Sequence, residues 1–217
     1  MNTTAIIPVR FRDCFDERCQ TVFHYKQKPL WEHTVESAIG SSKVDQIIIA
    51  YDDDRITSML DWHQPKIDLF KRPEFLSLEG VTTLDVLQHV VAKYTNSNKT
   101  DYFMLLEISH PDRPLDLLDS LVKTAEKRPA DSHITVKPIK YNYWVQNNEK
   151  GSSRIVGGGE NTNITIYQEL LGIGSLFSKQ SCLSAEPFGI EVNMIPLEGD
   201  WVEVDLRNGF SDKRSLV

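Results

Sequence analysis

Four cationic side chains follow the first apolar run of the chain, which extends from Thr3 to Val9. They are Arg10, Arg12, Arg18 and Lys26. Guanidinium and ammonium groups in such a segment can hold a triphosphate and offset the charge that develops on it during a reaction. The same segment carries Asp13, Asp16 and Glu17, so a solvated loop with internally balanced charges is the alternative interpretation.

Two acidic segments provide candidate metal ligands. Tyr51 to Asp54 follows a second apolar run, where carboxylates can bind Mg²⁺, hydrogen-bond a ribose or cap the next helix. Near the C-terminus, Glu203 and Asp205 flank a valine, and strand alternation places both carboxylates on one face. Two acids close to a polyphosphate form a natural Mg²⁺ site, and two solvent-facing acids on an edge strand are the alternative.

A mixed polar segment from Glu107 to Arg113 ends another apolar run. Arg113 can hold a phosphate or a carboxylate because its guanidinium presents paired N–H donors. His110 is interpreted as a loop residue, which a lone histidine in such a position usually is. The chain contains neither a Gly-x-x-x-x-Gly-Lys nor a Gly-x-Gly-x-x-Gly pattern, so the two common phosphate-binding motifs are excluded.

The elements that position these segments alternate between strands and helices. Apolar runs predict strands at 3–9, 46–50, 67–70 and 102–106. Helical spacing predicts helices that begin near Leu30, Asp54, Thr82 and Pro114, separated from the first strand by a long loop over 11–27. Thr82 is the expected N-cap of its helix, with Asp85 at the third helical position. This order is typical of a doubly wound, mostly parallel sheet, in which ligands bind beyond the carboxyl ends of the strands.

The pattern changes after Pro129. Short apolar runs predict strands at 134–136, 143–145, 176–177 and 190–195. Such strands suit an antiparallel extension or a dimerisation arm. No interior linker divides the chain, so we expect residues 1–217 to form one domain with a β-rich arm at about 138–175.

Composition and charge limit the class of protein. With 40% hydrophobic and 25% charged residues, the chain has the composition of a globular protein, and its formal net charge of −7 argues against general nucleic-acid binding. No apolar run reaches the roughly 18 residues of a membrane span, and the N-terminal run is too short for a signal peptide. We therefore expect a cytoplasmic location. Cys14, Cys19 and Cys182 are interpreted as reduced, structurally incidental thiols.

Taken in order, several segments resemble the acylneuraminate cytidylyltransferases, the family that includes the CMP-sialic acid synthetases. The segments that carry the resemblance are 5–10, 28–30, 44–53, 72–76, 81–90, 104–113, 142–144 and 203–205. They resemble, among others, the family's Pro-Ala-Arg opening, its Gly-Lys-Pro-Leu segment and its Asp-Ile-Asp metal motif. The resemblance implies an α/β fold of the nucleotide-diphospho-sugar transferase type with a small β-rich dimerisation arm.

The resemblance also implies a reaction. CTP and a small acidic sugar, of the nonulosonic or ketodeoxy class, would give a CMP ester and pyrophosphate. Arg10 and Asp205 would be catalytic, and Mg²⁺ would be held by Asp205 with help from Glu203. The implied nucleotide-binding residues are Arg10, Arg12, Arg18, Asp52, Asp53, Arg72 and Asp85. Glu107, Ser109 and Arg113 would line the sugar pocket, and the protein would be a homodimer.

Two other interpretations stay open. The segment from Phe11 to Gln20 contains no glycine, although backbone N–H groups must approach phosphates closely, and Glu107 stands where the family has a glutamine. These features favour a catalytically inactive relative that acts as a binding or partner subunit. The third interpretation is another sugar nucleotidyltransferase, or a nucleotide-sugar glycosyltransferase, which differs in its choice of nucleotide.

Overall fold

The structure is a computed structural model that describes residues 1–11, 15–16, 21–59, 65–94, 99–139, 142–147, 151–156, 165–199, 202–204 and 206. Its first half alternates between strands and helices, as predicted. The principal elements of this half are β1 (Thr3–Val9), α2 (Leu30–Gly40), β6 (Gln46–Tyr51), α3 (Asp54–Met59), β7 (Ile67–Lys71), η1 (Glu74–Ser77), α4 (Thr83–Lys93), β8 (Tyr102–Leu105) and α5 (Leu117–Lys127).

The segment predicted as one long loop contains short strands where it is described. They are β2 (Phe15–Asp16), β3 (Thr21–Val22) and β4 (His24–Tyr25), and β5 (Lys28–Pro29) follows directly after that segment. β2 pairs with β3 and β4 pairs with β5, both antiparallel. The β4–β5 turn uses Lys26 and Gln27 at φ angles of 46° and 67°, which is the left-handed geometry of a tight hairpin. Strands this short carry too little periodicity to be predicted.

The second half extends the sheet. Its elements are β9 (Ser132–Pro138), β10 (Asn142–Asn147), β11 (Gly151–Val156), β12 (Tyr167–Glu169), α6 (Leu171–Gly174), β13 (Ser175–Ser178), α7 (Lys179–Cys182) and β14 (Val192–Pro196). The four strands predicted here are present, whereas β11 and β12 were not predicted. β10 and β11 form a separate antiparallel hairpin inside the predicted arm, and Trp144 on it is 69% exposed. The dimerisation role of this arm stays a prediction.

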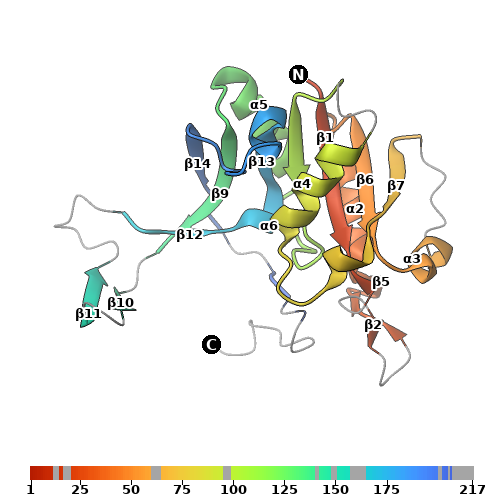
Figure 1. Cartoon of the computed structure of the whole chain (residues 1–217), viewed down its shortest axis with the longest axis horizontal. Coiled ribbons are helices and arrows are strands. Elements are labelled where there is room, and N and C mark those ends of the chain that lie inside the picture. The colour runs from red at the N-terminus through yellow and green to blue at the C-terminus, as the bar shows by residue number, and fades with distance from the viewer. Residues whose placement is uncertain are drawn as a thin grey trace.

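The main sheet has the order β12-β9-β13-β8-β1-β6-β7, with β14 beside β9 (Figure 1). β1 is parallel to both β6 and β8, and β6 is parallel to β7. From β1 the chain winds first toward β7 and then back to β8 on the other side. This reversal confirms the predicted doubly wound, mostly parallel sheet and places its topological switch point between β1 and β8.

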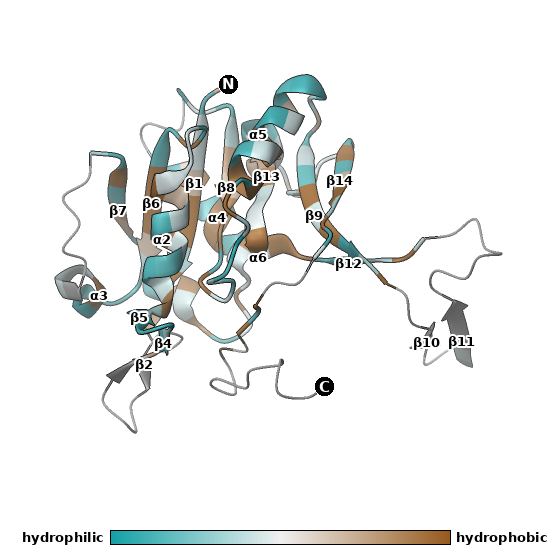
Figure 2. Ribbon diagram, turned by 180° about the vertical axis from the view of Figure 1, so that it is seen from behind, coloured by the Kyte–Doolittle hydropathy of each residue, from teal (hydrophilic) through white to brown (hydrophobic). Residues whose placement is uncertain are grey.

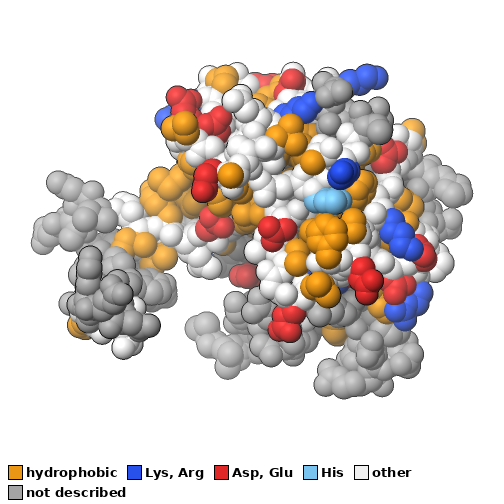
Figure 3. All heavy atoms as spheres, in the orientation of Figure 1, with side chains coloured by type: hydrophobic (Ala, Val, Ile, Leu, Met, Phe, Trp, Pro, Cys, Tyr) orange, Lys and Arg blue, Asp and Glu red, His pale blue; other side chains and the backbone are white. Residues whose placement is uncertain are grey.

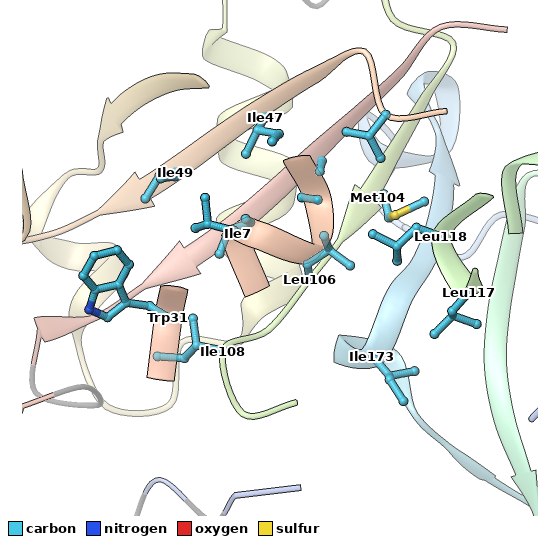
Figure 4. Close-up of a cluster of buried hydrophobic side chains, with 14 of the residues drawn as sticks. Ile7, Trp31, Ile47, Ile49, Met104, Leu106, Ile108, Leu117, Leu118 and Ile173 are labelled. Atoms are coloured by element: carbon cyan, nitrogen blue, oxygen red, sulfur yellow. The ribbon is translucent and has the colours of Figure 1, made fainter. Parts of the chain in front are cut away.

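Hydrophobic side chains fill both faces of the sheet. Ile47, Ile48 and Ile49 are all fully buried, because alternate residues of β6 face different layers. Ile47 and Ile49 join the cluster under α2 and α5, which Figure 4 shows around Ile7 and Met104. Ile48 joins the cluster under α4. Hydrophilic and hydrophobic residues both occur along α2 and α5, as the teal and brown parts of these ribbons show (Figure 2).

The helix starts agree with prediction at α4 and differ at α5. Thr82 and Asp85 form a complete capping box at the start of α4, as predicted. α5 buries the expected leucines, but it begins at Leu117, with Asp116 at the cap, and not at Pro114. The Pro114 carbonyl accepts a hydrogen bond from the Leu117 N–H at 3.1 Å, which closes a turn ahead of the helix. The predicted start was therefore three residues early.

The surface of the described residues is mixed. Acidic, basic and hydrophobic side chains are interspersed on the face in Figure 3.

Cys182 is buried and unpaired, and burial raises the pKa of its thiol to about 12, which keeps it protonated and unreactive. None of the helices within the described ranges combines the length and the hydrophobicity that a membrane crossing needs.

Candidate functional site

A pocket lies at the switch point of the sheet. Residues after the carboxyl ends of β1, β7 and β8 meet the N-terminus of α4 there. The lining residues are Pro8, Arg10, Arg72, Thr82, Thr83, Val86, Glu107, Ile108 and Leu206. The space they enclose is about 60 Å³. This space holds a single small polar group and not a whole nucleotide, which needs a pocket of roughly 300 Å³ or more.

Arg10 and Arg72 bring two guanidinium groups to this pocket. Arg72 is only 4% exposed, and its Nη2 lies 3.3 Å from the Asp52 Oδ2 in an ion pair. The other Asp52 oxygen accepts a hydrogen bond from the Phe11 N–H at 2.9 Å. Asp52 therefore couples the end of β1 to Arg72. Arg10 is half-buried, and two cations that follow separate strands can together bind one anionic ligand.

Asp53 and Asp85 are both engaged at helix ends. Asp53 accepts hydrogen bonds from the Arg55 backbone N–H and Nε at 2.9 Å each, and these bonds lower its pKa to about 2. Asp85 accepts from the Thr82 N–H at 2.7 Å and from its hydroxyl. The capping alternative is thus confirmed for an acid of the 51–54 segment. Nucleotide contacts by either residue stay predictions.

Glu107 presents its carboxylate at the pocket. The Thr83 hydroxyl donates to Oε1 at 2.6 Å, and the Ser109 hydroxyl lies 3.2 Å from Oε2. The Glu107 N–H donates to the Gly172 carbonyl at 2.8 Å, which ties the end of β8 to α6. A Cβ atom at position 172 would lie 2.4 Å from the Glu107 side chain, so only glycine leaves room for it. Glu107 is therefore held in place from three elements.

Arg113 lies behind the pocket and is 8% exposed. All five of its N–H donors are engaged by the chain itself. The acceptors are the carbonyls of Glu107, His110, Gly172 and Ile173 and the hydroxyl of Thr34. Burial lowers its pKa to about 9, which still leaves it charged at neutral pH. We call this set the Arg113 network. A sugar contact by Arg113 would require one of these bonds to break.

His110 and Lys26 also have defined places. His110 is 5% exposed, and burial, followed by the charge of Arg113, lowers its pKa to about 3. His110 lies in the loop after β8, as predicted, and its side chain is a buried neutral imidazole. Lys26 forms an exposed ion pair with Asp112 at 3.1 Å, and the Tyr25 hydroxyl donates to the same carboxylate at 3.2 Å.

The acidic C-terminal segment reaches the same edge of the sheet. The Val204 N–H donates to the Ser109 carbonyl at 2.8 Å, and Val202 and Val204 pack with Leu30. Glu203, between these two valines, is exposed. Asp205, Arg12 and Arg18 lie outside the described residues. Within the described part of the chain, no group of three or more His, Cys, Asp or Glu side chains is placed to hold a metal ion.

The structure adds residues that sequence reasoning missed. Thr83, Thr34 and Gly172 each contact Glu107 or Arg113, although they lie 24 to 79 positions away in sequence from the groups they bind. Thr83 follows the predicted N-cap, so its place at a helix start was recognisable. Its partner was not, because the pairing depends on how α4 packs against β8.

Solved structures provide the comparison that classifies this fold. One is a CMP:2-keto-3-deoxy-manno-octonic acid synthetase complexed with CTP, at 13% identity and a TM-score of 0.61, covering 94% of this chain and 93% of that one. The chain has a nucleotidyltransferase-like fold. The 2-C-methyl-D-erythritol 4-phosphate cytidylyltransferase of Francisella tularensis matches at 11% identity and a TM-score of 0.67, covering 96% of both chains.

A third structure, the 4-diphosphocytidyl-2C-methyl-D-erythritol synthase of Anaerococcus prevotii, matches at 12% identity and a TM-score of 0.64, covering 94% of this chain and 90% of that one. At these identities the likeness establishes the fold, whereas substrates and mechanism depend on the site itself. No protein-family model matches the chain, and no curated protein sequence matches it.

Proposed function

We propose that this protein is a CTP-dependent cytidylyltransferase that activates an acidic nonulosonic or ketodeoxy sugar as its CMP ester. The observation that carries the proposal is the pocket at the switch point, where Arg10 and Arg72 converge on a sheet of the nucleotidyltransferase type. Ligands of such sheets bind at this position. All three solved proteins described above are named for chemistry with cytidine nucleotides, which supports CTP as the nucleotide.

In the proposed reaction, Arg10 and Arg72 offset the charge of the bound anions. Positioning and charge neutralisation are the main catalytic requirements, since the attacking hydroxyl and the α-phosphate must be held in line. The pocket has room for only one small group beside Glu107, so the rest of the nucleotide extends outside it. The N-terminus of α4, at Thr82 and Thr83, adds a positive helix end to the same wall.

Mg²⁺ is part of the proposal. Magnesium is commonly bound by one or two carboxylates together with substrate phosphates, so a full cage of protein ligands is not required. Glu203 fits this donor set, because its exposed carboxylate belongs to a segment bonded to the strand end at Ser109. Asp205 is the second proposed ligand. The ion would neutralise the triphosphate.

The test is pyrophosphate release by the purified protein with CTP, Mg²⁺ and a panel of acidic sugars. Release that depends on both CTP and one sugar would establish the activity and identify the acceptor. In Arg10→Gln we expect kcat/KM for CTP to fall at least about tenfold, which corresponds to one lost charge-assisted contact. Arg128→Gln, an exposed arginine outside the pocket, is the matched control and should leave kcat/KM unchanged.

A second candidate function is favoured by the glycine-free segment from Phe11 to Gln20. If the protein neither releases pyrophosphate nor binds CTP in calorimetry, the cytidylyltransferase proposal fails and a binding or partner subunit becomes the better interpretation. Release with another nucleotide in place of CTP would instead indicate a different sugar nucleotidyltransferase.

A further inference from the structure

The carboxylate of Glu107 has a place in the pocket that the function proposed above does not yet use. Arg10 and Arg72 account for the binding of anions, and Glu107 is the acidic side chain among the described residues that line the same space. An anionic ligand group would avoid this carboxylate. A ligand hydroxyl would be attracted to it, because an ionised carboxylate can only accept hydrogen bonds.

The environment of Glu107 keeps that accepting capacity available. Its two oxygens receive hydrogen bonds from the hydroxyls of Thr83 and Ser109, and each oxygen retains further lone-pair sites for a ligand donor. Within the described residues, no lysine or arginine forms an ion pair with this carboxylate. The Arg113 guanidinium contacts the Glu107 carbonyl instead. The carboxylate is thus fixed in position without being neutralised.

A chain of hydrogen bonds runs from the interior to Glu107. Ser109 Oγ lies 3.0 Å from His110 Nδ1 and 3.2 Å from Glu107 Oε2. Because the Ser109 hydroxyl donates its proton to the carboxylate, it accepts from His110, whose proton is then on Nδ1. His110 stays neutral at pH 7, since burial lowers its pKa to about 3. The chain therefore orients Ser109 as a donor to Glu107.

We propose that Glu107 is the general base that removes the proton from the attacking hydroxyl of the acceptor sugar. This inference rests on the proposed cytidylyltransferase function. The acceptor oxygen forms a bond to the α-phosphorus of CTP as the bond between that phosphorus and the bridging oxygen of pyrophosphate breaks. Pyrophosphate leaves with the electron pair, and the hydroxyl proton passes to the Glu107 carboxylate. Thr83 and Ser109 are positioning residues in this step.

The arrangement also predicts which part of the acceptor lies where. The reactive hydroxyl of the acceptor would enter the space beside Glu107, and the anionic groups of the substrates would lie outside it on the side of Arg10 and Arg72. Glu107 lines this small space, so a hydroxyl that enters it lies beside the carboxylate, as a general base requires. The charged and titratable groups around Glu107 are Arg10 and Arg72 across the pocket, His110 and Arg113 behind it, and Glu169, whose pKa is raised by burial and by the charge of Glu107.

The test compares wild type with Glu107→Gln, using CTP, Mg²⁺ and the acceptor identified by pyrophosphate release. Glutamine keeps the shape but cannot take the proton. We expect kcat to fall by about 100-fold or more, with KM for the acceptor changed by less than about threefold. Glu186→Gln, an exposed glutamate outside the pocket, is the control.

A second variant keeps the proposal testable if Glu107→Gln does not fold. Thr83→Val removes the donor to Oε1 without changing the side chain's shape and should lower kcat by about tenfold, the size expected for a hydrogen bond to a charged group. Thr83→Ser should restore it. A kcat unchanged in Glu107→Gln or Thr83→Val, or a loss confined to KM, would overturn the inference alone. A wild type without turnover would overturn both proposals.

Discussion

The pocket wall and the Arg113 network are two polar regions built from the same strand ends, and they use their charges differently. The wall consists of Arg10, Arg72, Thr83 and Glu107, and it surrounds a space that a ligand group can enter. In the network, every donor of Arg113 is bonded to the chain itself. An arginine that lies near a site therefore does not necessarily bind a ligand. Its role follows from what its N–H groups already contact.

The largest expected effect is that of removing the centre of the network. Arg113→Met should lower the free energy of unfolding by about 3 kcal/mol or more, because several buried carbonyl groups lose their donors at once. Urea denaturation followed by circular dichroism measures this loss. Arg128→Met, an exposed arginine, should change stability by less than about 0.5 kcal/mol. If Arg113→Met and Arg128→Met lowered the free energy of unfolding equally, the structural role of the Arg113 network would be contradicted.

The second-largest expected effect is a loss of folding stability in acid, caused by protonation of His110. Its pKa is about 3 in the folded chain and ordinarily 6.5, so the unfolded chain binds one more proton between these values. Stability therefore falls as the pH falls, by about 2 kcal/mol between about pH 7 and about pH 5.

The variant His110→Gln isolates this contribution, because burial also lowers the pKa of His133 and His89. We expect its unfolding free energy to depend less on pH than that of the wild type, as measured by urea denaturation at each pH. Identical pH dependence in the two proteins would show that His110 titrates as it does in water.

The smallest loss of stability is expected from a substitution in the pocket lining. Thr82→Ala removes the N-cap of α4 and should cost about 1 kcal/mol, since one backbone donor loses its partner. Lys93→Ala, at the other end of the same helix, is the control and should cost less than about 0.5 kcal/mol. Thermal unfolding measured on both variants checks the order. A loss in Thr82→Ala as large as that in Arg113→Met would contradict the comparison.

Local patterns were sufficient to predict the first half of the molecule. The longer strands and helices there are recognisable within a dozen residues: Ile47 to Ile49 indicate a buried strand, and the stripe around Leu87 indicates a helix that follows a capping box. A pocket at the carboxyl edge of the sheet also agrees with the sequence, since parallel strands place their ends together. The short strands within 11–27, and β11 and β12 in the second half, were missed because two- or three-residue pairings and polar hairpins leave little periodicity.

The sequence by itself determined the doubly wound alternation, the helix cap at Thr82 and the residue types available at the strand ends. Tertiary structure decided how those residues are used. Arg72 and Glu107 line one pocket. Arg113, only six positions after Glu107, instead donates its hydrogen bonds to other groups of the chain. The physical reason is that hydrogen-bond partners such as Thr34 and Gly172 come from distant segments. Only the packing of those segments decides whether a charge faces a ligand or the chain.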